Sequence, residues 1–355
     1  MAYTTINKST DYFNTKLFTG NGSTTQAITG VGFQPDWFWI KCRNEAADNQ
    51  LSDAVRGKSG SLYYQLQSNG TGPQVVQGDN DGVHSLDSDG FTVGYTNSIA
   101  WNKSGNTYAT WNWKANGSGS SNTDGTITST VSANTTAGFS IVKYTGNATN
   151  STVGHGLGVT PQVVIVKNLD SSGGSAEHWR VQHHKVPASK VLYLNKTDAE
   201  DNNGDFQSTY PGSSTFSISS ADGCNKNGEA NIAYCFAEKT GYSKFGSYTG
   251  NSNTNGTFVY TGFKPAWLMM KRKEAVNSWY IFDNKRNLFN VTNSRLKADD
   301  SVVEYSNLDT VDFLSNGFKF REGNDAWNGS GNPYIYMAFA AAPLVGSNNV
   351  PCTAR

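Results

Sequence analysis

The stretch GFQPDWFWIK, which spans Gly32–Lys41, places four apolar residues in a row, and three of them are aromatic. The chain around it is polar, because only 36% of its 355 residues are hydrophobic and 37 are glycine. A strand with one wet face alternates apolar and polar side chains, so a continuous apolar run predicts a strand that is covered on both faces. One cover is the core of its own domain. The other cover has to come from elsewhere.

The apolar stretch is one of three copies. In each copy an (F/Y)TGN segment comes first, a proline follows its glycine by 15 residues, and an apolar run ending in lysine follows the proline. Chance does not keep such a register, so the spacing predicts internal repeats. The repeat signature consists of Gly20 with Pro35, Gly146 with Pro161, and Gly250 with Pro265.

The repeats predict the fold class and the domain boundaries. Each copy contains short β-branched and aromatic runs separated by Gly, Asn and Asp, a pattern typical of antiparallel sandwiches and jelly rolls. We therefore predict an all-β protein made of three tandem antiparallel β-sandwich or jelly-roll-like repeats. The predicted boundaries are 1–114 for the first repeat, 115–124 for a flexible Gly/Ser-rich linker, 125–240 for the second repeat, 241–343 for the third repeat and 344–355 for a C-terminal tail.

The second face of the apolar strands predicts further packing. Burying one Trp or Phe side chain stabilises a protein by about 1.5–3 kcal/mol, and a row of exposed aromatics promotes aggregation. A loop, a neighbouring repeat or another subunit therefore has to cover this face. We expect close packing between the repeats, and a homo-oligomer.

Composition excludes several classes of function. Because 28 Lys+Arg balance 28 Asp+Glu, the chain has no basic excess for nucleic-acid binding. The N-terminal segment MAYTTINKSTDYF does not resemble a signal peptide, and no apolar run is long enough to insert into a membrane. The cysteines fit no zinc spacing, so we expect free thiols and no cofactor. They are Cys42, Cys224, Cys235 and Cys352.

The acidic residues suggest little catalytic chemistry. Asp53 and Asp283 each precede an arginine by three residues, which favours buried ion pairs over catalytic carboxylates. The segment EHWRVQHH at 177–184 is interpreted as polar surface rather than a metal site. The loop DNDGVHSLDSDG holds weak candidates for calcium ligands, for which turn formation is the alternative; these are Asp79, Asp81, Asp87 and Asp89. We expect no enzymatic activity, with polysaccharide cleavage as the alternative.

Two pairs of tryptophans are candidates for ligand binding. Two of these residues precede Asn in matching WN-x-SGN turns, where the ring could stack on a sugar while the amide donates hydrogen bonds. The alternative, which the sequence favours, is that the ring anchors its turn onto the sandwich. The hypothetical ligand-binding residues are Trp101, Asn102, Trp327, Asn328, Trp179 and Trp279.

Three quoted segments carry a resemblance to a known family. They are TGNGSTTQAITGVGFQPDWFWIKCRN, DGTITSTVSANTTAGFSIVKYTGN and the closing VGSNNVPCTAR. Together they resemble a family of uncharacterised repeat proteins of tailed phages of marine bacteria, cyanophages included, and the resemblance covers nearly the whole chain. It implies a virion structural protein of the tail-fibre or appendage type and supplies no catalytic residues. The second repeat lacks the Trp-Asn closing motif.

The resemblance sets the functional expectations. We expect a phage appendage, made in the host cytoplasm without a signal peptide and carried on the virion, that binds a host-surface glycan or protein. Phage fibres are typically trimers, so a trimer is the favoured oligomer, with other virion proteins as further partners. The alternatives are a capsid decoration protein and, third, a polysaccharide depolymerase.

Overall fold

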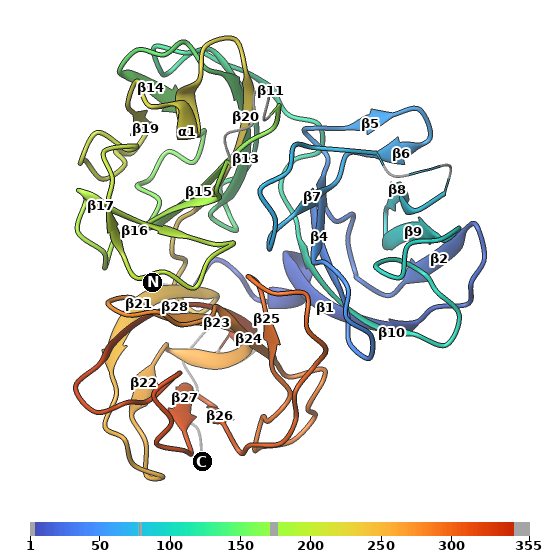
Figure 1. Ribbon diagram of the computed structural model, residues 1–355, viewed down its shortest axis with the longest axis vertical. Coiled ribbons are helices and arrows are strands. Elements are labelled where there is room, and N and C mark those ends of the chain that lie inside the picture. The colour runs from blue at the N-terminus through green and yellow to red at the C-terminus, as the bar shows by residue number, and fades with distance from the viewer. Residues whose placement is uncertain (1–3, 77, 79, 171–176, 344–355) are drawn as a thin grey trace.

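The computed structural model describes residues 4–76, 78, 80–170 and 177–343. These residues form almost entirely β structure, which confirms the all-β prediction (Figure 1). Helix is confined to two single turns, η1 (Ser9–Asp11) and α1 (Asp222–Asn225). Within the described ranges, neither turn has the length or apolar character that crossing a bilayer requires. The predicted tail at 344–355 lies outside the described residues.

The first lobe pairs a large sheet with a small one. Phe38 and Ile40 of the large sheet pack against Phe91 and Val93 of the small sheet. The strands of the large sheet, in their order across the sheet, are β1 (Phe13–Thr19), β10 (Thr107–Trp113), β3 (Trp37–Cys42), β4 (Gln50–Asp53) and β7 (Leu66–Gln67). Those of the small sheet are β2 (Gln26–Thr29), β9 (Gly90–Gly94) and β8 (Gly82–Asp87). A separate hairpin joins β5 (Lys58–Ser59) to β6 (Leu62–Tyr63).

The second lobe has the same organisation with a larger main sheet. Val164 and Val166 of this sheet pack with Phe216 and Ile218 of its small sheet. The strands of the large sheet, in their order across the sheet, are β11 (Ser120–Asn122), β12 (Ser129–Asn134), β13 (Phe139–Thr145), β20 (Ala230–Phe236), β15 (Val163–Asn168), β16 (Arg180–His183), β17 (Lys190–Tyr193) and β18 (Asp201–Asn202). The small sheet pairs β14 (Ser151–Gly154) with β19 (Thr215–Ile218).

The third lobe repeats the arrangement of the first. Leu268 and Met270 of its large sheet pack against Phe318 and Phe320 of its small sheet. The large sheet has the order β21 (Ser243–Thr249), β28 (Pro333–Pro343), β23 (Phe263–Arg272), β24 (Tyr280–Asp283), β25 (Leu296–Lys297); the small sheet has the order β22 (Phe258–Tyr260), β27 (Gly317–Phe320), β26 (Val311–Leu314).

One strand order is common to the three large sheets. The strand carrying the (F/Y)TGN segment pairs with the last strand of its lobe, which pairs with the strand after the repeated proline, and all three pairings are antiparallel. The orders are β1-β10-β3-β4, β13-β20-β15-β16 and β21-β28-β23-β24. This common order supports the interpretation of the chain as three repeats.

The stretch predicted as a flexible linker is ordered instead. Within 115–124, β11 pairs with β12, and the backbone N–H of Asn116 donates a 2.8 Å hydrogen bond to Oγ of Ser132. Gly119 lies so close to the backbone of Val131 that an added Cβ would come within 2.8 Å of it. Gly119 therefore permits close strand packing here rather than flexibility.

A central aromatic cluster covers the second face of the apolar strands. The three lobes surround a common centre (Figure 1), and the inner faces of their large sheets form one buried hydrophobic cluster. Trp37 of the first lobe stacks on Tyr234 of the second with ring centroids 4.5 Å apart, and Phe13 stacks on Phe339 of the third at 5.1 Å. Phe236 and Phe339 join the second and third lobes at 6.1 Å. Neighbouring lobes of the same chain thus supply the predicted cover.

The lysine that ends each apolar strand lies at an interface between lobes. Lys41, Lys167 and Lys271 are fully buried, and each ammonium group donates to a carbonyl oxygen of another lobe. The acceptors are Ser301 at 2.7 Å for Lys41, Thr71 at 3.1 Å for Lys167 and Thr197 at 3.0 Å for Lys271. The first lobe thus contacts the third, the second contacts the first, and the third contacts the second. This cyclic set of contacts closes the three lobes into a ring.

Candidate functional site

The tryptophans proposed from the sequence are buried. Trp101 and Trp179 have no exposed surface, and Trp279 and Trp327 are 2% exposed. The indole N–H of Trp179 donates to the carbonyl of Gln67 in the first lobe at 2.8 Å, and that of Trp279 donates to the carbonyl of Tyr193 in the second lobe at 2.8 Å. A sugar cannot stack on these rings, so the ligand-binding hypothesis for them is corrected to a role in packing.

The two asparagines have a structural role as well. Asn102 and Asn328 are fully buried. The side-chain amide of Asn102 donates to Oδ1 of Asn21 at 3.0 Å, and that of Asn328 donates to Oδ1 of Asn251 at 3.0 Å. Each asparagine therefore fixes the (F/Y)TGN segment of its own lobe, and neither amide faces an external ligand.

The glycine of the repeated segment fits directly against the turn that holds this asparagine. A Cβ added to Gly20, Gly146 or Gly250 would lie 2.2–2.3 Å from a backbone carbonyl oxygen. A side chain cannot be accommodated at such distances, which explains why the sequence places glycine at these positions. The repeated prolines are buried; Pro35 and Pro161 lie two residues before β3 and β15, whereas Pro265 lies within β23 at an irregularity of its pairing with β28.

The acidic candidates for calcium binding hold turns in place. Asp81 accepts hydrogen bonds from the backbone N–H groups of Thr96 and Ser98 at 2.7 and 3.1 Å, and Asp89 accepts them from two glycine N–H groups. Asp87 accepts one from the hydroxyl of Thr92 at 3.0 Å. Asp79 lies outside the described residues. Within the described ranges, no group of three His, Cys, Asp or Glu residues is placed to hold a metal ion.

The paired acids Asp53 and Asp283 are fully buried. Nε of Arg56 donates to Asp53, and Nε of Arg286 donates to Asp283 at 2.6 Å. Neither carboxylate faces a cleft, so neither is placed to act on a polysaccharide. The interpretation of the segment 177–184 as polar surface is wrong, because Glu177, Gln182 and His183 are buried. Burial lowers the pKa of His183 to about 3, and the neighbouring charge of His184 contributes to this shift.

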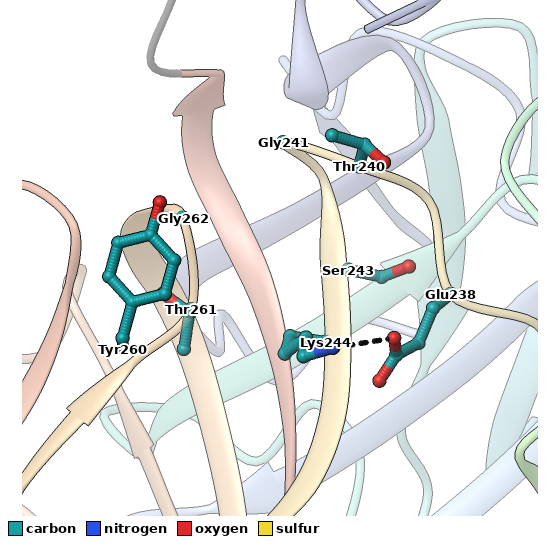
Figure 2. Close-up of a pocket in the computed structure, with 8 residues that line it drawn as sticks. All are labelled: Glu238, Thr240, Gly241, Ser243, Lys244, Tyr260, Thr261 and Gly262. Carbon is teal, nitrogen blue, oxygen red and sulfur yellow. Dashed lines mark hydrogen bonds and ion pairs between the residues drawn. The ribbon is translucent and has the colours of Figure 1, made fainter. Parts of the chain in front are cut away.

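An open cavity of about 370 Å³ lies where the second lobe meets the third (Figure 2). The connection between β20 and β21 forms one wall, and the turn between β22 and β23 forms the other. The lining residues are Glu238, Thr240, Gly241, Ser243, Lys244, Tyr260, Thr261 and Gly262.

Tyr260 is the exposed aromatic residue of this cavity. It is 61% exposed, whereas the neighbouring Thr261 is 6% exposed. Figure 2 shows its ring on one side of the opening and the pair formed by Glu238 and Lys244 on the other. Because Tyr260 belongs to an edge strand whose alternate side chains point outward, its ring is presented to solvent without disturbing the core.

The charged residues of the cavity neutralise each other. Nζ of Lys244 lies 2.8 Å from Oε2 of Glu238, and Oε1 of Glu238 accepts the backbone N–H of Phe245 at 2.8 Å. Ser243 accepts the backbone N–H of Lys239 through its hydroxyl at 3.0 Å. An exposed ring beside neutralised, hydrogen-bonding groups suits a hydroxylated ligand better than a strongly charged one. The constellation contains no nucleophile paired with a base, so it favours binding.

Sequence reasoning overlooked this cavity. The segment TFVYTG, with outward Phe258 and Tyr260 around inward Val259, carries the alternation of an edge strand. That alternation could have identified Tyr260 as an exposed ring. Glu238 comes from the connection between two lobes and Lys244 from β21 of the third lobe, so their proximity to Tyr260 depends on the tertiary packing.

The chain belongs to a family described as a domain of unknown function (DUF7483), whose sequence model matches residues 8–343. The match begins one residue before η1 and ends with β28, so a single family model spans all three lobes. No curated protein shows significant sequence similarity to the chain.

Proposed function

We propose that the protein is a surface component of a tailed-phage particle that binds a glycan of the host cell through the cavity beside Tyr260. The single observation that carries the binding role is the 61% exposed tyrosine ring facing a neutral Glu238–Lys244 pair across an open cavity. Exposed aromatic rings stack on sugar faces, and adjacent polar groups select the hydroxyls. The placement on a phage particle rests on the sequence resemblance alone.

Binding to immobilised oligosaccharides tests this proposal. The purified chain should bind a subset of bacterial surface oligosaccharides on an array, and Tyr260→Ala should reduce that binding about tenfold, because one lost stacking contact of about 1.4 kcal/mol corresponds to that factor. Phe258→Ala is the matched control, since Phe258 lies on the same strand, is 44% exposed and does not line the cavity. Equal binding by both variants and the original chain would contradict the proposal.

A labelled antibody on intact particles tests the location. Label at the tail supports an attachment appendage, and label over the head supports capsid decoration. Particles that carry no label would contradict both assignments.

Capsid decoration is kept as a second candidate because of one surface feature. Leu288 and Phe289, between β24 and β25, are 72% and 84% exposed, and adjacent exposed apolar residues commonly mark protein contacts. If the protein decorates the shell, Leu288→Ser with Phe289→Ser should weaken its binding to emptied heads. Val276→Ser, at a position that is 74% exposed, is the matched control. Unaltered binding of the double variant would remove this candidate.

A further inference from the structure

A second cavity, of about 220 Å³, lies in the third lobe and combines aromatic rings with cations. Its central residue is Arg295, which is 7% exposed. The guanidinium carbon lies 5.4 Å from the ring centroids of both Tyr305 and Trp327. The lining residues are Tyr280, Arg295, Lys297, Tyr305, Leu308, Asn324, Ala326 and Trp327.

Two backbone hydrogen bonds hold this arrangement. The N–H of Arg295 donates to the carbonyl of Tyr305 at 2.8 Å, and the N–H of Tyr305 donates to the carbonyl of Arg295 at 3.1 Å. Tyr305 is 38% exposed, so its ring forms an accessible edge of the cavity. The cation and the accessible ring are therefore fixed relative to each other before a ligand arrives.

The positive charge of Arg295 is poorly compensated. Its Nη2 donates to Oδ1 of Asn307 at 2.8 Å, whereas its Nη1 is buried and has no hydrogen-bond partner among the residues that the structure describes. Glu322 interacts with it electrostatically, but within the described ranges no carboxylate oxygen lies within 4.0 Å of the guanidinium nitrogens. Burial lowers the pKa of Arg295, with smaller opposing effects from Tyr280, Glu322 and Tyr305.

Two other buried arginines show what compensation looks like in this chain. Arg56 is 4% exposed and Arg286 is 8% exposed, and each forms an ion pair with an aspartate three residues before it. In both, burial acts to lower the pKa, but the combined effect of the neighbouring groups, led by the aspartate, outweighs burial, so the pKa is raised. A buried cation without such a partner is costly unless an anion arrives to pair with it.

The first lobe has a cavity at the corresponding place, and it lacks this chemistry. Gln50 occurs three residues before Asp53, as Tyr280 occurs three residues before Asp283, and Ala100 precedes Trp101 as Ala326 precedes Trp327. Gln50 and Ala100 line this cavity together with Ile99, four small residues and one acid, Asp48. The fold therefore does not require Arg295, Lys297 or Tyr305 at this place, and their presence is particular to the third lobe.

We propose that the third-lobe cavity binds the acidic group of a saccharide, a carboxylate or a sulfate, with Arg295 and Lys297 pairing with the charge and Tyr305 contacting the sugar ring. Nζ of Lys297 lies 3.4 Å from Oδ2 of Asp300 at the partly exposed rim, and such a pair contributes little energy that a pair with an incoming anion would not replace. This site shares no residue with the cavity beside Tyr260, so the two proposals can fail separately.

Calorimetric titration of the full chain with three probes tests the inference. The probes are a tetrasaccharide of uronic acids, a sulfated tetrasaccharide and a neutral tetrasaccharide of glucose. At least one acidic probe should bind at least about tenfold more tightly than the neutral one, as a charge-assisted contact predicts, and the tighter acidic probe identifies the group. Equal affinity for the acidic and neutral probes, or no binding of either acidic probe, would overturn the inference.

Variants assign the binding to this cavity. Arg295→Gln should weaken binding of the acidic probe about tenfold, and Lys297→Gln and Tyr305→Ala should each weaken it about threefold. Arg321→Gln is the charge-matched control, because its side chain is 44% exposed outside the cavity. If Arg295→Gln does not fold, the rim variants Lys297→Gln and Tyr305→Ala test the assignment in its place. Rim variants that bind like the original chain would refute the assignment.

Discussion

The hydroxyl of Tyr234 donates a 2.8 Å hydrogen bond to Oδ2 of Asp53, and this bond joins the second lobe to the first. The same carboxylate receives the guanidinium of Arg56. The indole N–H of Trp111 donates to Asp283 at 3.1 Å and joins the first lobe to the third in the same manner. Each of these two aspartates therefore compensates a buried cation and also holds a neighbouring lobe.

Asp53→Asn should be strongly destabilising. The change removes the charge that pairs with Arg56 while both side chains stay buried, and breaking a buried pair costs about 3–5 kcal/mol. Urea denaturation followed by tryptophan fluorescence measures the loss. Asp11→Asn, which disrupts an exposed pair with Lys8, is the control and should have little effect. Similar midpoints for the two variants would contradict the role given to Asp53.

Gly250→Ala should destabilise the third lobe by about 1–3 kcal/mol, because the added Cβ would lie 2.3 Å from the carbonyl oxygen of Gly329. Gly204→Ala is the matched control, since nothing lies within 4 Å of its added Cβ. Thermal unfolding of the two variants measures the difference. A Gly250→Ala protein as stable as the control would show that this close approach does not constrain the sequence.

The buried lysines should make stability depend on pH. Burial lowers the pKa of Lys41, Lys167 and Lys271 to about 8, although nearby acidic groups oppose the shift. Below pH 8 both folded and unfolded chains carry the proton and the full cost of burying the charge is present. Between pH 8 and the unfolded value near 10.5 the unfolded chain binds more protons, so the lysine contribution to stability improves as pH rises.

A lysine variant isolates this contribution. From pH 7 to pH 9.5 the original chain should gain about 1–2 kcal/mol in unfolding free energy relative to Lys271→Met. Lys185→Met, at an exposed lysine, should show no such relative change. Urea denaturation at the two pH values gives the numbers. If the difference in unfolding free energy between the original chain and Lys271→Met stays constant with pH, the pKa of this lysine is not lowered in the folded chain.

Trp101→Ala should reduce stability rather than ligand binding. The ring is fully buried in the first-lobe core, and removing such a side chain costs about 3–5 kcal/mol. Chemical denaturation and the oligosaccharide array, used on the same variant below its unfolding midpoint, separate the two effects. Normal stability with lost glycan binding would restore the sugar-stacking role to this residue.

Part of the fold follows from the sequence because strand periodicity records burial. The apolar run around Trp37 predicted a strand covered on both faces, and Phe38 does face its own sandwich while Trp37 faces the centre. The pattern did not say what covers the second face. Neighbouring lobes of the same chain cover it. The homo-oligomer remains a prediction, but the need to cover these strands no longer argues for it.

The candidate site was less accessible to sequence reasoning. A tryptophan in a polar turn such as Trp101 looks the same in sequence whether its ring points inward or outward. Tyr260 and Lys244 lie on different sheets of the third lobe, and Glu238 comes from the connection to the second lobe, so only the folded chain brings them to one cavity. Arg295 differs from Arg56 and Arg286 because, among the described residues, it forms no ion pair with a carboxylate. Glycine and serine around 115–124 likewise have the same composition in a flexible linker and in an edge strand.

The contact between Lys41 and Ser301 spans 260 positions of the chain. During synthesis the first lobe therefore emerges from the ribosome long before the residues that close the ring exist. Until then the tryptophan side of its main sheet lacks part of its cover, a state that favours association with other nascent chains or with a chaperone. We expect chains that stop after the first lobe to accumulate as insoluble protein, while the complete chain folds.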